Sequence, residues 1–140
     1  MRILICGSRD WEFPEIIRDS LETHMYAFPT IIEGEATGAD ADARDIAHDL
    51  ALPVEPYPAD WTKYKRAAGP IRNQQMLDKG KPDTVWAFFK NIERSRGTCD
   101  MVTRALRAGL PVFAVEARVI PENELRERLG LEEKTTAPDK

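Results

Sequence analysis

The amino-acid sequence predicts an α/β domain of the Rossmann-like type, a three-layer sandwich around a mainly parallel five-stranded sheet. Short apolar runs alternate along the chain with longer segments of helical periodicity, which is typical of strand-helix-strand units. The short runs are apolar throughout and not only at every second residue, as in strands that are buried on both faces. Right-handed connections between such strands place helices on both sides of the sheet.

The first half of the chain contains two strands and two helices in this interpretation. Residues 3–6 are a short apolar run and form the first strand. A helix begins near Pro14, because the fixed φ of proline suits a first helical turn. Residues 30–33 form the second strand. Small apolar residues then mark one face of a helix from Ala39, which Pro53 brings to an end.

The middle of the chain is less uniform. Residues 54–57 are a third strand, kept short by the prolines around it. Residues 59–66 fit either a short helix or an ordered loop, and both alternatives stay open. A further helix starts at Gly69 with Pro70 in its first turn, and we expect Gly80 to provide a left-handed exit.

The last part of the chain completes the alternation. Residues 84–89 form the fourth strand, and residues 101–106 show helical spacing, with Gly109 as the cap of that helix. Residues 111–115 supply the fifth strand, and residues 122–129 a final surface helix.

Length and composition indicate one globular domain. We assign it to residues 1–130 of the 140, and predict a disordered tail at residues 131–140, which are polar and have little to bury. No apolar run reaches the length of a membrane span, and the N-terminus has the pattern of a strand and not of a signal peptide. We therefore expect no membrane association and a cytoplasmic location.

The charged and metal-binding residue types limit the function further. A net charge of −4 argues against nonspecific binding of nucleic acid, which depends on a basic face. Two cysteines and two histidines suggest neither a disulfide framework nor a zinc site, so we expect no metal and no cofactor. A small anion needs only a local positive pocket, and arginines gather in several of the loops.

Glycine-bearing loops point to a ligand site at one edge of the sheet. Ligands of open parallel sheets bind beyond the carboxyl ends of the strands, and a glycine lets a phosphate or ribose approach the backbone closely. The turn at Gly97 also starts a helix, whose first N–H groups attract anions. The predicted ligand-binding residues are Gly7, Ser8, Arg9, Gly34, Gly38, Asp40, Arg72, Asn73, Arg96, Gly97 and Thr98.

Several side chains at this edge of the sheet have both a structural and a functional interpretation. Thr98 either caps its helix or donates to a phosphate oxygen. Asp40 is explained by the helix dipole or holds a ribose hydroxyl, and Arg9 points into the crevice or lies along the surface. Arg72 opens a helix, where a cation is unfavourable unless an anionic ligand or a carboxylate is near. Asp100 either complements the dipole of its helix or stabilises cationic charge on a ribose.

Five segments, taken in order, resemble the SLOG superfamily in its YspA or cpYpsA-related branch, and the match runs from residue 3 to about residue 115. The segments are Gly7-Ser8-Arg9-Asp10-Trp11, Gly34-Glu35-Ala36-Thr37-Gly38-Ala39-Asp40, Pro58-Ala59-Asp60-Trp61, Ala68-Gly69-Pro70-Ile71-Arg72-Asn73-Gln74-Gln75-Met76 and Gly97-Thr98-Cys99-Asp100-Met101. The resemblance implies a Rossmannoid fold, a nucleotide or nucleotide-derived ligand, and self-association into a homo-oligomer.

The resemblance also implies two catalytic positions, and the sequence departs from the pattern at both. Lonely Guy members of the superfamily cleave the N-glycosidic bond of nucleoside 5′-monophosphates with an arginine and a glutamate, to which Arg72 and Asp100 correspond by similarity. Here Asn73 replaces the lysine that follows the arginine, and Asp100 is one methylene shorter than the glutamate. The loop before Gly97 also lacks the usual glycine pair and carries Arg94 and Arg96 instead.

We therefore predict a module that binds a nucleotide or an ADP-ribose-like ligand at the carboxyl edge of the sheet, as a sensor or a sequestering protein. The alternative is a phosphoribohydrolase with Arg72 and Asp100 as catalytic residues. A third hypothesis, binding of single-stranded DNA as in the DprA relatives, is disfavoured by the acidic net charge.

Overall fold

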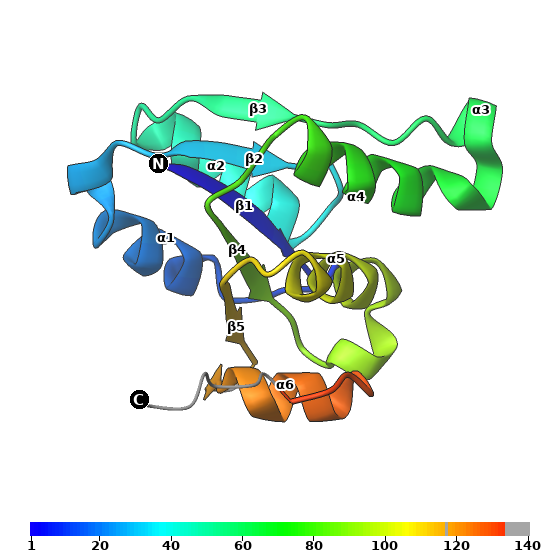
Figure 1. Ribbon diagram of the computed structural model, residues 1–140. Coiled ribbons are helices and arrows are strands. Elements are labelled where there is room, and N and C mark those ends of the chain that lie inside the picture. The colour runs from blue at the N-terminus through cyan, green and yellow to red at the C-terminus, as the bar shows by residue number, and fades with distance from the viewer. Residues whose placement is uncertain (117, 134–140) are drawn as a thin grey trace.

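A six-stranded sheet forms the centre of the computed structural model, which describes residues 1–116 and 118–133 (Figure 1). The strand order is β3-β2-β1-β4-β5-β6, and all neighbours are parallel except β5 and β6. The strands are β1 (Arg2–Gly7), β2 (Thr30–Glu33), β3 (Val54–Pro56), β4 (Thr84–Phe88), β5 (Val112–Val115) and β6 (Val119–Ile120). The chain direction switches between β1 and β4, so these two strands end side by side.

Helices cover both faces of this sheet, as Figure 1 shows. The two helices α1 and α2 pack on one face, and α4, α5 and α6 pack on the other. The helices are α1 (Pro14–Glu22), α2 (Ala39–Asp49), α3 (Trp61–Tyr64), α4 (Ala68–Asp78), α5 (Arg96–Arg107) and α6 (Glu122–Arg128). Short 3-10 helices precede β2 at Met25–Ala27, join α3 to α4 at Lys65–Ala67 and precede α5 at Ile92–Arg94.

The apolar strands follow from this two-sided burial. Along β1, Ile3 and Ile5 face the α1 and α2 side, whereas Leu4 and Cys6 face α4 and α5. Each of these four side chains is buried, so none of the four positions favours a polar residue. The predicted Rossmann-like class is therefore confirmed.

The predicted number of strands was one too small. Strand β6 has two residues and pairs antiparallel with β5, a length at which hydrophobic periodicity gives no signal. The open segment at residues 59–66 contains the short helix α3 and part of the following 3-10 helix. Of the predicted tail, Leu131 packs against the core, whereas residues 134–140 lie outside the described residues.

The predicted left-handed exit at Gly80 was wrong. The positive φ after α4 belongs to Lys81, at 46°, and Gly80 is not among the residues with positive φ. Glycine is needed at position 80 for another reason, because a Cβ there would lie 2.3 Å from the carbonyl oxygen of Met76. The predicted cap at Gly109 is confirmed by its φ of 77°.

Gly7 allows the close approach of β1 to its surroundings at the carboxyl end of the sheet. A Cβ at this position would lie 1.9 Å from the carbonyl oxygen of Phe88 and 2.6 Å from the Cβ of Ala39. The backbone N–H of Ser8 donates to the same Phe88 oxygen at 2.9 Å. Gly7 therefore fixes how closely β1, β4 and the start of α2 meet.

We expect Gly7→Ala to lower the free energy of unfolding by at least about 2 kcal/mol, because neighbouring backbone must move to admit the methyl group. Chemical denaturation measures the effect. Gly69→Ala is the matched control, since a Cβ at Gly69 would meet only Trp61, at an ordinary 3.5 Å. Equal stability of the two variants would contradict the close packing at Gly7.

Candidate functional site

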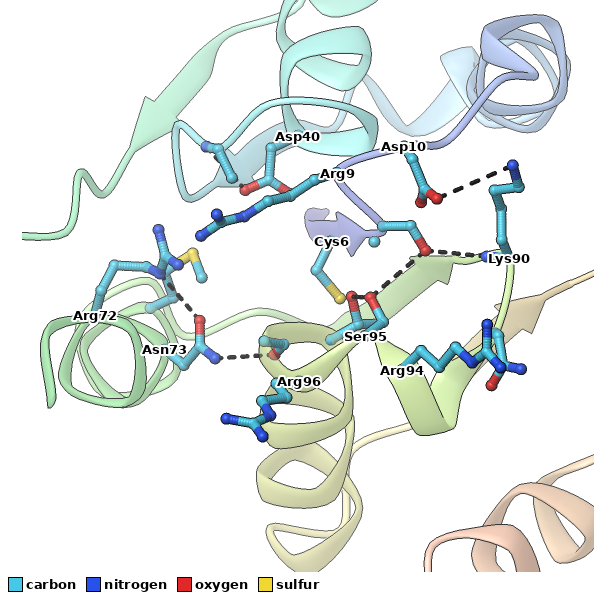
Figure 2. Close-up of a pocket in the computed structure, with 17 residues that line it drawn as sticks. Cys6, Arg9, Asp10, Asp40, Arg72, Asn73, Lys90, Arg94, Ser95 and Arg96 are labelled. Atoms are coloured by element: carbon cyan, nitrogen blue, oxygen red, sulfur yellow. Dashed lines mark hydrogen bonds and ion pairs between the residues drawn. The ribbon is translucent and has the colours of Figure 1, made fainter. Parts of the chain in front are cut away.

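A cavity of about 780 Å³ opens at the carboxyl end of β1 and β4 (Figure 2). Its walls come from the loop after β1, the start of α2, helix α4 and the segment between β4 and α5. The structure brings most of the predicted site residues together here. Those that line the cavity are Gly7, Ser8, Arg9, Asp40, Arg72, Asn73, Arg96, Gly97 and Thr98.

Gly34 and Gly38 do not line the cavity but position residues that do. The carbonyl oxygen of Gly34 accepts a hydrogen bond from Nη1 of Arg72, and its N–H donates to Oδ2 of Asp40 at 3.2 Å. Gly38 has a φ of 73°, and a Cβ there would lie 2.2 Å from the carbonyl oxygen of Ser8. Both glycines therefore let the loop between β2 and α2 pack tightly behind the cavity.

The N-terminus of α5 forms one wall of the cavity. Helix α5 begins at Arg96, and its N-cap residue Ser95 makes no capping hydrogen bond through its side chain. A Cβ at Gly97 would meet nothing within 4 Å, so the backbone is open there. Thr98 is a buried residue of the first turn and not the cap, and its Oγ1 lies 3.0 Å from Oγ of Ser95. The free N–H groups of this turn can bind an anion.

Arg72 forms the opposite wall of the cavity and is a charged residue that is largely buried. Its exposed fraction is only 9%. Its Nε donates to Oδ1 of Asn73 at 3.0 Å, and its Nη1 donates to the carbonyl oxygen of Gly34. Within residues 1–116 and 118–133, no carboxylate lies within ion-pair distance of its guanidinium, and Nη2 makes no hydrogen bond. A buried cation normally has an anionic partner.

Asp40 interacts electrostatically with the positive charges of Arg72 and Arg9 but forms no ion pair with either residue. Its Oδ2 accepts from the N–H groups of Gly34 and Ala36, at 3.2 and 3.3 Å. Burial raises the pKa of Asp40 to about 6, although these hydrogen bonds and the charges of Arg72 and Arg9 oppose the rise. The carboxyl group is thus in the cavity wall, but it is held by the loop.

Asn73 and Asp100 connect α4 to α5 beside the cavity. Nδ2 of Asn73 donates to Oδ2 of Asp100 at 2.9 Å and to the carbonyl oxygen of Gly97 at 3.2 Å. Nε of Arg104 donates to the same Asp100 oxygen at 2.8 Å. Asp100 is not among the residues that line the cavity, so the structure separates it from Arg72 and places Asn73 between them.

Sequence reasoning missed several residues of the cavity. The additional lining residues are Cys6, Asp10, Ala36, Met76, Lys90, Asn91 and Ser95, and Arg94, which the sequence had indicated beside Arg96, lines the cavity too. Lys90 could not be identified from a glycine pattern, because it lies two residues after the end of β4 with no glycine beside it. It pairs with Glu12 at 3.1 Å. Burial raises the pKa of the Cys6 thiol, which keeps it protonated and unsuited to act as a nucleophile.

The part of the chain that the structure describes offers neither a metal site nor a membrane-spanning helix. No cluster of histidine, cysteine and acidic residues there could hold a metal ion. No helix in that part has the length and apolar character needed to cross a bilayer.

The fold and the cavity together define a Rossmann-like α/β domain with a cationic crevice at the carboxyl edge of its sheet. The model of the YspA, cpYpsA-related SLOG family matches residues 1–64. The Gene 61 protein of Mycobacterium phage D29 is 33% identical over 120 residues, which cover 80% of this chain and 94% of the phage protein. The chain belongs to the YspA, cpYpsA-related SLOG family.

A solved structure has the same fold at lower sequence identity. DNA processing protein A (DprA) from Streptococcus pneumoniae superimposes with a TM-score of 0.61 at 17% identity. The match covers 92% of this chain but 54% of the DprA chain, so this protein spans about half the length of that relative.

A buried carboxyl group behind the site gives a measurable pH dependence. Glu33 is fully buried at the end of β2; its Oε1 accepts from the N–H of Glu35 at 3.0 Å, and among the described residues its Oε2 has no partner. Burial raises the pKa of Glu33 from 4.5 to about 7, and the nearby carboxylates of Asp40 and Glu35 contribute in the same direction. The folded protein therefore favours the protonated form.

We expect Glu33→Gln to become more stable relative to the wild type as the pH rises from about 4.5 to 8. The raised pKa of Glu33 gives the wild type a stabilising contribution that is fully present below 4.5, the pKa of the unfolded chain. This contribution is lost as the pH rises through about 7, the pKa of the folded protein. The gain of the variant reaches the order of 3 kcal/mol by pH 8. Denaturation at several pH values measures it, with the exposed Glu127→Gln as control. A difference that does not change with pH would contradict the raised pKa.

Proposed function

We propose that this protein binds a nucleotide or a nucleotide-derived, ADP-ribose-like ligand in the cavity at the carboxyl edge of its sheet, and acts as a sensor or sequestering module. The single observation that carries the proposal is Arg72, a largely buried residue with no carboxylate partner among the described residues, whose Nη2 makes no hydrogen bond with them and is not fully buried. An anionic ligand would supply the missing partner.

The other groups of the cavity wall also suit a ligand that combines an anionic group with polar groups such as hydroxyls. Arg9 extends toward the part of the cavity where Arg72 lies (Figure 2), and both contribute positive charge at Asp40. The first turn of α5 offers free N–H groups beside the hydroxyls of Ser95 and Thr98. A volume of about 780 Å³ suits a whole nucleotide, since ligand pockets measure roughly 300 to 1,000 Å³.

Family membership supports a role in nucleotide-related binding or in DNA processing. Small ligands are favoured over DNA because the chain has a net charge of −4, and a long phosphate backbone would be repelled outside the cavity. Binding without turnover is favoured over hydrolysis because the carboxylate of Asp100 is held by Asn73 and Arg104 and does not line the cavity.

We expect AMP, ADP or ADP-ribose to raise the melting temperature of the wild type, and Arg72→Met to weaken binding of the same ligand by about tenfold or more. The variant loses charge-assisted donors to the ligand, whereas its fold loses an unpaired buried cation and is expected to keep its stability. Calorimetric titration and thermal shift measure the two effects.

Arg107→Met serves as the matched control, because Arg107 is an exposed residue of α5 that does not line the cavity. Its ligand affinity is expected to equal that of the wild type. A folded Arg72→Met protein with unchanged affinity would exclude Arg72 as the anion-binding residue, and a wild type that binds none of the three ligands would contradict the proposed function.

Gly97→Ala is expected to weaken ligand binding without lowering the stability of the fold. Alanine favours the helix by about 0.5 kcal/mol over glycine, and a Cβ at this position has no neighbour within 4 Å. The methyl group would occupy space next to the N–H groups of α5 where we place the phosphate, so affinity for AMP should fall by about tenfold. Gly69→Ala, in the first turn of α4 and away from the cavity, should leave that affinity unchanged. Unaltered AMP binding in a folded Gly97→Ala protein would exclude a phosphate on this turn.

A further inference from the structure

A second cavity of about 200 Å³ lies between α3 and the first turns of α4. Arg72 lines this small cavity as well as the large one, and no other residue of the described part of the chain lines both. Arg72 therefore borders both cavities, and among the described residues no carboxylate lies within ion-pair distance of its guanidinium.

The small cavity is too small to be an independent site. Its volume falls below the roughly 300 to 1,000 Å³ of pockets that hold a whole ligand. A single sugar or base ring is the size of group that it can receive.

The lining of the small cavity has the chemistry of a ring site. Tyr64 and Ile71 supply half-buried apolar surface, and Gln75 supplies a side-chain amide that makes no hydrogen bond with the described residues. Lys63 places its Nζ 5.0 Å from the centre of the Tyr64 ring, at the same cavity. Asp60 also lines the cavity, so polar groups predominate in its lining beside the apolar groups of Tyr64 and Ile71. This mixture suits a ring that carries hydroxyl or amide groups.

The segment that forms this cavity is well defined. Asp60 caps α3 by accepting a hydrogen bond from the N–H of Lys63 at 3.0 Å. The ring of Trp61, the first residue of α3, lies next to Gly69 in the first turn of α4. This contact packs α3 against the start of α4. Figure 1 shows α3 beside α4 at the end of the molecule, beyond the carboxyl end of β3.

We propose, on the basis of the proposed function, that the ligand is a diphosphate-linked molecule with a ring at each end. Its nucleotide end occupies the large cavity, its diphosphate passes Arg72, and its second ring, a sugar or a base, enters the small cavity. Arg72 then lies beside the diphosphate, offsets part of its negative charge, and donates through Nη2, which makes no hydrogen bond with the described residues.

The test compares AMP, ADP and ADP-ribose by calorimetric titration of the full chain. AMP and ADP lack the second ring, and ADP differs from AMP only by a phosphate. We expect the wild type to bind ADP-ribose about tenfold more tightly than ADP. Gln75→Trp, which fills the small cavity, should abolish this gain while it leaves the affinities for AMP and ADP within about twofold of the wild type.

Two further variants keep the test decisive. Tyr64→Ala empties the wall of the small cavity and should reduce the gain for ADP-ribose, even if Gln75→Trp does not fold. Lys79→Trp places the same bulk at the exposed far end of α4 and should change nothing.

The possible failures are distinct. Equal affinity of the wild type for ADP and ADP-ribose, or an ADP-ribose gain that survives in Gln75→Trp and Tyr64→Ala, would overturn the second-ring site and leave the proposed function intact. A parallel loss for all three ligands in the variants would also overturn it, because the small cavity would then only support Arg72. A wild type that binds none of the three would instead remove the proposed function.

Discussion

The positive charge of Arg72 is the constraint on which the site depends. The residue has an exposed fraction of 9%, and an amide oxygen and a backbone carbonyl accept from its Nε and Nη1 in place of a carboxylate. These neutral acceptors hold the side chain in place but leave its charge largely uncompensated. The loop at Gly34, the start of α2 and helix α4 are therefore arranged around a cation that has no carboxylate partner among the described residues.

The contacts of Asn73 explain why the departures from the hydrolase pattern occur together. An amide at position 73 accepts from Arg72 through its oxygen and donates to Asp100 through its nitrogen, which a lysine cannot do. The shorter carboxylate of Asp100 remains between α4 and α5, where Arg104 also holds it. In this arrangement Asp100 positions Asn73, and through it Arg72. The two altered residues thus form one connected unit that orients a cation.

The sequence predicted the layers of the fold and the edge at which the cavity lies, because strands buried on both faces and glycines at their carboxyl ends leave a clear pattern. It could not predict β6, which is too short for periodicity, or the turn at Lys81, whose positive φ depends on packing. The residue types around Gly97 also gave no sign that Asp100 would lie outside the cavity. That placement depends on a contact between α4 and α5, two helices separated by a whole strand.

The contrast between the acidic chain and its cationic cavity bears on the kind of ligand. Among the described residues, five cations and two carboxylates line the cavity, although the whole protein carries a net charge of −4. The cations are Arg9, Arg72, Lys90, Arg94 and Arg96, and the carboxylates are Asp10 and Asp40. At physiological ionic strength, exposed charges act over about 8 Å, so a small anion inside the cavity responds mainly to the arginines. A polymer that extends across the surface meets the surrounding acidic residues as well. This distribution of charge therefore supports the proposed compact phosphate ligand over a long nucleic acid.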